Sequence, residues 1–195
     1  MANARDIQAQ MTRQRIIECM FELLSTTDYN RIRIADIAKK ADISVGTFYL
    51  YFHSKSDVAT TLVHERNVIL TQDLTIENDL PVVEQYHNYV DAYLKLIQSD
   101  GFEFSRGIML AMLEEYVGNQ ATSISLQEEY IVKLLEHGIA TGELNAKVIA
   151  PKQFFTLFIS SVNGTLIEWF YSKDDNTLIQ GMMNLKKLIC LMATA

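Results

Sequence analysis

Apolar residues recur every three or four positions along most of the chain, which is the spacing of a helix that buries one face. This pattern predicts an all-α fold of about nine helices. Two short helices are expected between residues 34 and 52. The longer helices are expected at residues 9–26, 54–73, 81–98, 104–116, 125–141, 151–172 and 177–193. Hydrophobic residues make up 49% of the 195 residues and only two are proline, which suits a packed helical core.

The stretch from Ile34 to Phe52 has the pattern of two helices joined by a tight turn. Ser44 is a good N-cap for the second helix, because its hydroxyl can accept a hydrogen bond from a backbone N–H one turn ahead. Phe48 and Phe52 lie four residues apart and would form the buried edge of that helix. In a helix-turn-helix, the second helix enters the DNA major groove by its N-terminal end. A helical hairpin packed in a core would give a similar pattern, so the following residues matter.

A new helix is expected to begin at Ser54, with Asp57 as the partner in a variant of the capping box. Lys55 then lies in the first turn of this helix, where a cation is unfavourable for the helix dipole. Its position is better explained if the same turn faces a DNA phosphate. This feature favours the DNA-binding interpretation over a simple core hairpin.

Residues 36–57, DIAKKADISVGTFYLYFHSKSD, resemble the N-terminal domain of the TetR family of bacterial transcription regulators, and the similarity extends from about Thr12 to Val58. The matching positions are Ile16, Phe21, Leu24, Tyr29, Ile37, Ala38, Ala41, Ser44, Gly46, Thr47, Tyr49, Phe52, Ser54 and Lys55. Two positions depart from the family pattern. Asp42 stands where the family often has Gly, but Asp tolerates a left-handed backbone better than most residues. Arg33 stands where the family often has Thr, which loses a helix cap and adds a cation.

The resemblance implies a helix-turn-helix DNA-binding domain at residues 1–58, and a helical effector-binding and dimerisation domain at residues 59–195. It implies DNA contacts from Arg33, Ser44, Val45, Gly46, Thr47, Tyr49, Leu50, Tyr51 and Lys55. We interpret Val45 and Thr47 as base contacts, and Tyr49 and Lys55 as phosphate contacts. Small residues at the start of the second helix would let its backbone approach the DNA closely.

Family members typically form homodimers through their last two long helices, and these helices are apolar on more than one face here. The expected interface residues are Phe158, Val162, Trp169, Met182, Leu185 and Ile189. The common mechanism of the family is a repressor that a small molecule releases from its operator DNA. The alternative is a protein of the same fold that acts through a protein partner, without a small-molecule inducer.

The expected effector pocket consists mainly of aromatic and methionine side chains, each of which could equally be an ordinary core residue. These residues are His64, Tyr86, Tyr89, Tyr93, Met109, Met112, Tyr116, Phe155 and Phe158. Few conspicuous polar groups occur among them, which indicates a small apolar or aromatic effector.

The net charge of −7 is divided unevenly along the chain. Residues 1–60 hold eight Lys/Arg and seven Asp/Glu, whereas residues 61–195 hold nine and seventeen. The candidates for phosphate contact are Arg5, Arg13, Arg15, Arg31, Arg33, Lys39, Lys40 and Lys55. Because this basic footprint is modest, the affinity for DNA is expected to depend on doubling it in a dimer.

The sequence contains no nucleophile–base pair, phosphate-binding glycine loop or metal-ligand spacing, so neither an enzyme nor a cofactor or metal is expected. Cys19 and Cys190 are expected to be reduced, buried thiols rather than a disulfide, which suits the cytosol. There is no signal-peptide core and no uncharged run long enough to cross a bilayer. We therefore expect a cytoplasmic protein without membrane contact.

Overall fold

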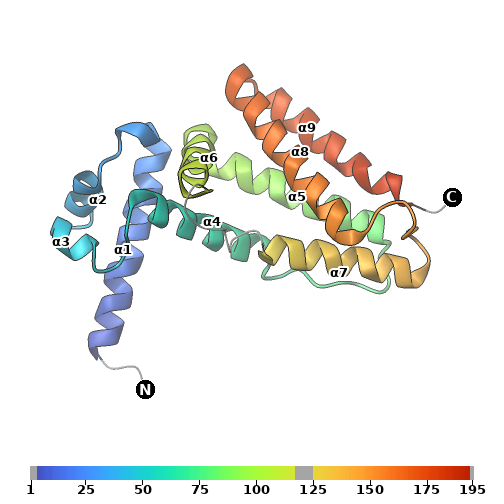
Figure 1. The fold of residues 1–195 in the computed structure, drawn as a ribbon, viewed down its shortest axis with the longest axis horizontal. Helices are drawn as coiled ribbons and strands as arrows, with labels where there is room; N and C mark the ends of the chain where they lie inside the picture. Colours follow the sequence, from blue (N-terminus) through green and yellow to red (C-terminus); the bar gives the residue numbers. More distant parts are fainter. Residues whose placement is uncertain (1–3, 117–124, 194–195) are drawn as a thin grey trace. The chain divides into compact units, whose positions relative to one another are not determined.

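The computed structural model describes residues 4–116 and 125–193, without the side chains of Glu115, Tyr116 and Ser125. The described residues form helices joined by turns, together with one isolated β-bridge between Leu144 and Ala193 (Figure 1). The predicted all-α fold class is therefore confirmed. The helices are α1 (Ala4–Thr26), η1 (Tyr29–Arg31), α2 (Ile34–Lys40), α3 (Val45–Phe48), α4 (Lys55–Thr71), α5 (Val82–Asp100), α6 (Phe102–Tyr116), α7 (Ser125–Thr141), α8 (Pro151–Ser172), α9 (Asp175–Leu188) and η3 (Ile189–Leu191).

Most predicted helix positions agree with the structure, and α8 has the predicted bounds. Helix α1 begins five residues earlier than predicted, so residues 4–8 are also helical. Met11 of this helix is 62% exposed although its side chain is apolar. Helix α9 ends earlier than predicted, at Leu188, and continues as the 3-10 turn η3.

The chain divides into two compact units. The first unit contains residues 1–66 and 100–123, and the second unit contains residues 67–99 and 124–195. Helix α6 belongs to the first unit because it packs against α1, and Arg106 binds Asp28 at 2.7 Å there. The compact first unit is thus larger than the DNA-binding domain predicted at residues 1–58, and that boundary stays a prediction.

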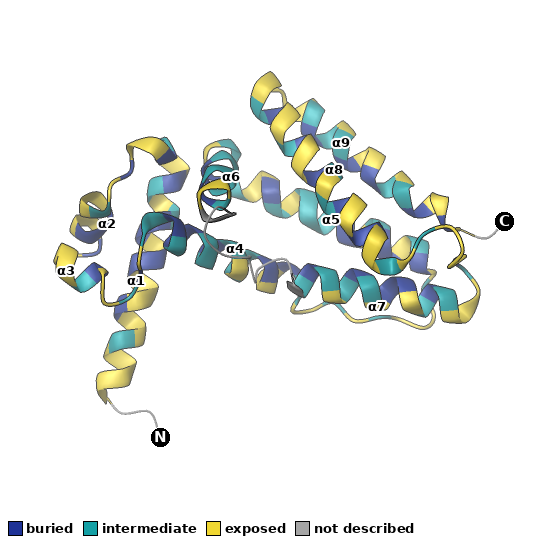
Figure 2. Ribbon diagram, viewed as in Figure 1, coloured by how far each residue is buried: buried dark blue, intermediate teal, exposed yellow. Residues whose placement is uncertain are grey.

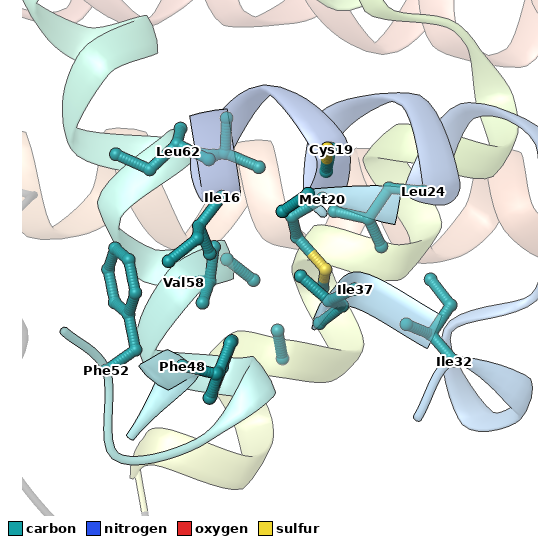
Figure 3. Close-up of a cluster of buried hydrophobic side chains, with 14 of the residues drawn as sticks. Ile16, Cys19, Met20, Leu24, Ile32, Ile37, Phe48, Phe52, Val58 and Leu62 are labelled. Atoms are coloured by element: carbon teal, nitrogen blue, oxygen red, sulfur yellow. The ribbon is translucent and has the colours of Figure 1, made fainter. Parts of the chain in front are cut away.

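The core of the first unit is formed by apolar side chains from α1, α2, α3 and α4, which point toward one another (Figure 3). These include Ile16, Met20, Leu24, Ile37, Phe48, Phe52, Val58 and Leu62, each no more than 4% exposed. Phe48 and Phe52 form the predicted buried edge of the helix-turn-helix. They fix the orientation of α3, so the opposite face of that helix remains at the surface.

The second unit contains α5, α7, α8 and α9. Its most extensive helix packing is between α8 and α9, which lie side by side (Figure 1). The turn between them is closed by Lys173, which adopts a left-handed backbone with φ 55°. The two helices approach so closely that a Cβ atom added to Gly181 would lie 2.2 Å from Cγ2 of Thr165. A residue larger than glycine at position 181 is therefore excluded unless the helices move apart.

Both cysteines are free thiols, as predicted, but only Cys19 is buried. Cys190 is exposed in η3, so the prediction of a buried thiol is wrong at this position. The turn places its side chain on the outer surface while the neighbouring Ile189 enters the core. Among the described residues, no helix is both long enough and apolar enough to cross a membrane.

Candidate functional site

The turn between α2 and α3 depends on Asp42, which has a left-handed backbone with φ 52°. Its neighbour Ile43 donates a backbone hydrogen bond of 3.0 Å to the carbonyl of Ala38, which closes the turn. Asp is among the few residue types that adopt this conformation readily. The prediction that Asp42 can replace the glycine of the family pattern is therefore confirmed.

Helix α3 begins with the predicted cap. The backbone N–H of Thr47 donates to Oγ of Ser44 at 2.9 Å, and the hydroxyls of Ser44 and Thr47 are 2.8 Å apart, within hydrogen-bond distance. This pairing orients both hydroxyls at the N-terminal end of α3. Although the helix has only four residues, backbone hydrogen bonds continue the turn as far as Phe52.

The face of α3 opposite Phe48 is open to solvent. Val45 is 43% exposed, Tyr49 52% and Leu50 80%, while Ser44 and Gly46 are exposed and Thr47 and Tyr51 are half-buried. A Cβ atom added to Gly46 would meet only Oγ of Ser44, at an ordinary 3.6 Å. The fold itself therefore does not require glycine at position 46. The predicted DNA-contact residues from Ser44 to Tyr51 are therefore exposed or half-buried, and they include hydroxyl side chains, two tyrosines and a glycine.

Arg33 is the exposed N-cap of α2, and its side chain makes no capping hydrogen bond. The carboxylate of Asp36 replaces part of the missing cap, because it accepts the backbone N–H of Arg33 at 2.9 Å. The loss of a cap predicted from this departure is confirmed. The guanidinium is thus left at the surface next to the helix-turn-helix.

Lys55 is half-buried and binds another segment of the first unit. Its ammonium donates to the backbone carbonyl of Tyr29 at 2.9 Å and lies 3.9 Å from the centre of the Tyr29 ring. The helix that it begins has the predicted Ser54 cap, since the N–H of Asp57 donates to Oγ of Ser54 at 2.9 Å. The carboxylate of Asp57 accepts a hydrogen bond from the backbone N–H of His53. The predicted capping box would instead use the N–H of Ser54, one residue later. Lys55 therefore anchors α4 to the turn after α1, and its predicted phosphate contact stays a prediction.

Other basic candidates for phosphate contact also have protein partners. Lys40 pairs with Glu22 at 2.7 Å, and this hydrogen bond raises the pKa of Lys40. Arg13 lies over the ring of Phe52 at 4.9 Å. Arg15, Arg31 and Lys39 are exposed, as is Arg5 at the start of α1.

The six residues predicted at the dimer interface are packed inside the chain. Phe158, Val162, Trp169, Met182, Leu185 and Ile189 are at most 2% exposed. Other residues form the outer surface of α8 and α9, where α8 is exposed on one side (Figure 2). The exposed apolar residues there are Leu157, Ile167, Tyr171 and Met183, all at least 46% exposed. These residues, and not the six predicted ones, are available to a second copy of the chain.

Five of the residues predicted for the effector pocket form one group of aromatic rings in the second unit. Phe158 lies 6.1 Å from Tyr86, 5.9 Å from Tyr89 and 6.2 Å from Phe155, measured between ring centres. Tyr93 lies 6.3 Å from Tyr89. The remaining predicted residues are elsewhere: His64, Met109 and Met112 belong to the first unit, and the side chain of Tyr116 lies outside the described part.

Sequence reasoning missed two buried amide side chains beside this aromatic group. Gln127 of α7 is 3% exposed and donates from Nε2 to Oδ1 of Asn67 at 2.6 Å. Asn67 is 6% exposed and lies in α4. Isolated glutamine and asparagine residues in helical sequences give no signal of burial, because both types are usually at the surface. The interior of the second unit is consequently more polar than its sequence indicates.

An ion pair in the first unit connects residues from α4 and α5. Arg66 binds Asp100 at 2.9 Å, and its guanidinium also lies over the rings of Phe21 and Phe104 at 4.7 and 5.7 Å. Burial raises the pKa of Asp100 to about 6, although Arg66 partly opposes this shift. Within the described part of the chain, no group of three His, Cys, Asp or Glu side chains is arranged to hold a metal.

Comparison with known proteins connects this arrangement to transcription regulators. Residues 16–61 match the family model for bacterial regulatory proteins of the tetR family. Over 185 residues the chain is 29% identical to the HTH-type transcriptional regulator SrpR of Pseudomonas putida, covering 92% of this chain and 84% of the relative.

Solved structures of similar fold include the transcriptional regulator FadR from Bacillus subtilis in complex with stearoyl-CoA. Its TM-score is 0.70 at 18% identity, over 92% of this chain and 98% of FadR. The regulatory protein TetR from Rhodobacter sphaeroides gives a TM-score of 0.67 at 18% identity, over 91% and 98% of the two chains. At these identities the solved structures support the fold, and the family model and the sequence relative support the class of protein.

Proposed function

The chain is a transcriptional regulator of the TetR family with a DNA-binding helix-turn-helix, and from that premise we propose that it is a dimeric cytoplasmic repressor released from its operator by a small molecule. The observation that carries the proposal is the surface of α3. Phe48 and Phe52 fix one side of the helix in the core, and the Ser44–Thr47 pair orients hydroxyls on the other. An ordered, exposed helix end of this kind fits the major groove.

The proposed base contacts are Val45 and Thr47 at the start of α3, and the proposed phosphate contacts are Tyr49 and Arg33. Lys55 contributes mainly by anchoring α4 through Tyr29. The phosphate contacts position the domain, while the base contacts select the sequence.

The proposed dimer pairs the outer faces of α8 and α9. Leu157, Ile167, Tyr171 and Met183 supply exposed apolar area there. Gly164 lies on the same side of α8, and a Cβ atom added to it would meet nothing within 4 Å in its own chain. A second copy can therefore approach the α8 backbone closely. Two-fold pairing would cover the same apolar face on both chains.

The proposed effector binds in the second unit, beside the aromatic group around Phe158. FadR of Bacillus subtilis, similar in fold, was solved with stearoyl-CoA, which supports a small-molecule ligand for this class of structure. An effector releases the DNA if it binds the DNA-free conformation more tightly than the DNA-bound one.

The test is a mobility-shift titration of the full-length protein on the DNA flanking its own gene, at two salt concentrations, with a scrambled duplex as control. We expect specific binding by a dimer that weakens with salt. Replacing Val45 or Thr47 should change the preferred sequence, whereas Tyr49→Ala should weaken binding to every duplex. Equal affinity for the flanking and scrambled duplexes would contradict the proposal.

A further inference from the structure

Two buried polar atoms in the described part of the second unit have no hydrogen-bond partner. They are the hydroxyl oxygen of Tyr89, on α5, and Oε1 of Gln127, on α7. Tyr89 is 0% exposed and Gln127 is 3% exposed, so water does not reach them from the surface. Folded proteins pair nearly all of their buried polar atoms, and an unpaired one needs a physical reason.

Neighbouring residues of the same types show how this unit normally pairs such groups. Tyr86, one helical turn before Tyr89, donates its hydroxyl to the carbonyl of Leu185 at 2.8 Å. Gln85 donates from Nε2 to the carbonyls of Glu77 and Leu80, and its Oε1 accepts the N–H of Glu77. The fold can therefore satisfy a buried tyrosine and a buried glutamine completely, and Tyr89 and Gln127 are exceptions to its own pattern.

The two exceptions belong to one cluster of polar side chains. The ring of Tyr89 is 5.4 Å from that of Tyr130 and 6.3 Å from that of Tyr93. The hydroxyl of Tyr93 is hydrogen-bonded to the side chain of Gln127, whose Nε2 also donates to Asn67. Tyr93 thus connects the two residues. If the amide of Gln127 is turned over, the unpaired atom becomes its nitrogen, so the amide retains an open position in either orientation.

This cluster is electrically neutral. Its members are tyrosine, glutamine and asparagine, and burial raises the pKa of both Tyr89 and Tyr93, so both keep their protons at neutral pH. Among the described residues of the second unit, no Asp, Glu, Lys or Arg is buried. Burial together with the carboxylate of Glu77 raises the pKa of Tyr130, and Glu77 is exposed. A charged ligand group beside Tyr89 and Gln127 would therefore lose its hydration without meeting a buried opposite charge, which is unfavourable.

We propose that the Tyr89–Gln127 cluster is the polar end of the effector site, and that the effector is a neutral aromatic molecule carrying a hydroxyl group. A hydroxyl supplies one donor and at least one acceptor. It can donate to Oε1 of Gln127 and accept from the hydroxyl of Tyr89, while its apolar part packs against the rings of Tyr130 and Phe158. This inference rests on the proposed function and replaces a purely apolar effector by one with a defined polar group.

The first test uses matched aromatic pairs that differ by one hydroxyl: naphthol with naphthalene, and hydroxybiphenyl with biphenyl. Their binding to the full-length protein is measured by calorimetry, with naphthoate as the charged probe. We expect at least one hydroxyl compound to bind about tenfold more tightly than its partner, and Tyr89→Phe to remove this preference. Equal affinities within the pairs, tightest binding of naphthoate, or no hydroxyl-dependent binding would each overturn the proposal.

The second test compares the thermal unfolding of Tyr89→Phe with that of Tyr86→Phe. Removing an unpaired buried hydroxyl should leave the Tm of the ligand-free protein unchanged or raise it, whereas removing the paired hydroxyl of Tyr86 should lower Tm by about 2–4 °C. An equal decrease in both variants would show that the Tyr89 hydroxyl has a structural partner, and would overturn the proposal. Neither test involves DNA, so its failure is distinguishable from a failure to bind the operator.

Discussion

Polar pairs close in sequence hold the helix-turn-helix, whereas the second unit also contains buried polar pairs between residues far apart in sequence. Ser44 binds Thr47, Asp36 binds Arg33 and Ser54 binds Asp57, each three residues apart. In the second unit, Gln127 binds Asn67 across 60 residues, and Tyr86 binds Leu185 across 99. The first arrangement forms with each local helix, whereas the second exists only when the whole unit has folded.

This difference has consequences for what each unit can do. A surface held by local caps keeps its shape when other parts of the protein change, as a DNA-reading helix requires. A core whose polar groups depend on distant helices can change its pairing when those helices shift, as the proposed response to an effector requires.

The largest effect on stability is expected from Gly181→Ala, which disturbs the packing of α9 against α8 in the second unit. The new methyl group would lie 2.2 Å from Cγ2 of Thr165, and the branched Thr165 side chain has little freedom to move aside. We expect the free energy of unfolding to decrease by about 1–3 kcal/mol, the usual cost of overpacking. Urea unfolding followed by circular dichroism measures it.

Gly164→Ala is the matched control, because it adds the same methyl group in open space on the neighbouring helix. The fold of this variant should be preserved, since alanine favours a helix over glycine. Weaker dimerisation in analytical ultracentrifugation would then report the proposed contact between copies. A loss of stability in Gly164→Ala as large as that in Gly181→Ala would contradict the packing described for α8 and α9.

An intermediate effect is expected from Gly46→Ala in the helix-turn-helix. The methyl group meets only Oγ of Ser44 at 3.6 Å, so the free protein should be at least as stable as the wild type. If the α3 backbone approaches the DNA closely, affinity should decrease about tenfold or more, which corresponds to about 1.4 kcal/mol. Fluorescence anisotropy on the operator and a thermal melt provide the two readings. Unchanged affinity would show that α3 does not approach the DNA through its backbone at this position.

A separate, pH-dependent effect concerns Asp100, whose pKa of about 6 in the folded state exceeds the ordinary 3.8 because of burial. Between these two pH values the folded state binds the proton more tightly than the unfolded state, so this group favours folding more as pH decreases from 6 to 4. Asp100→Asn should remove that gain. Urea unfolding at pH 4 and pH 7, for wild type and variant, measures the difference.

Asp28 is the control of opposite sign, since hydrogen bonds from Arg106 and from the N–H of Asn30 lower its pKa. The stability that it contributes is present above its unfolded pKa and is lost as pH falls through the lower folded value. The wild type should therefore lose stability in acid as Asp28 is protonated, and the Asp28→Asn variant should not show this loss. If both variants change the pH dependence of stability in the same direction, burial is not the main cause of the raised pKa of Asp100.

The same contrast explains what could be predicted from the sequence. The Ser44 cap, the Ser54 cap and the Asp42 turn depend on neighbouring residues, and the structure confirms them. Helix α8 was predicted with its observed bounds, because Pro151 marks its start and the apolar periodicity continues to its end.

The relations between distant helices could not be predicted in this way. Apolar residues occur around most of α8, so periodicity does not tell the face that packs on α9 from the face that remains outside. The six residues assigned to the dimer interface are consequently inside the chain. The pairing of Gln127 with Asn67, and the packing of α6 on α1, likewise depend on which helices meet after folding.

The exposed thiol of Cys190 allows the second unit to be labelled selectively at one position. Burial protects Cys19 and raises its pKa, so a maleimide reagent should modify the two cysteines at very different rates. One nitroxide label per chain, introduced without any mutation, would become two in a homodimer. The distance between these two spins would measure how the last helices of the two copies are arranged, with and without DNA or effector.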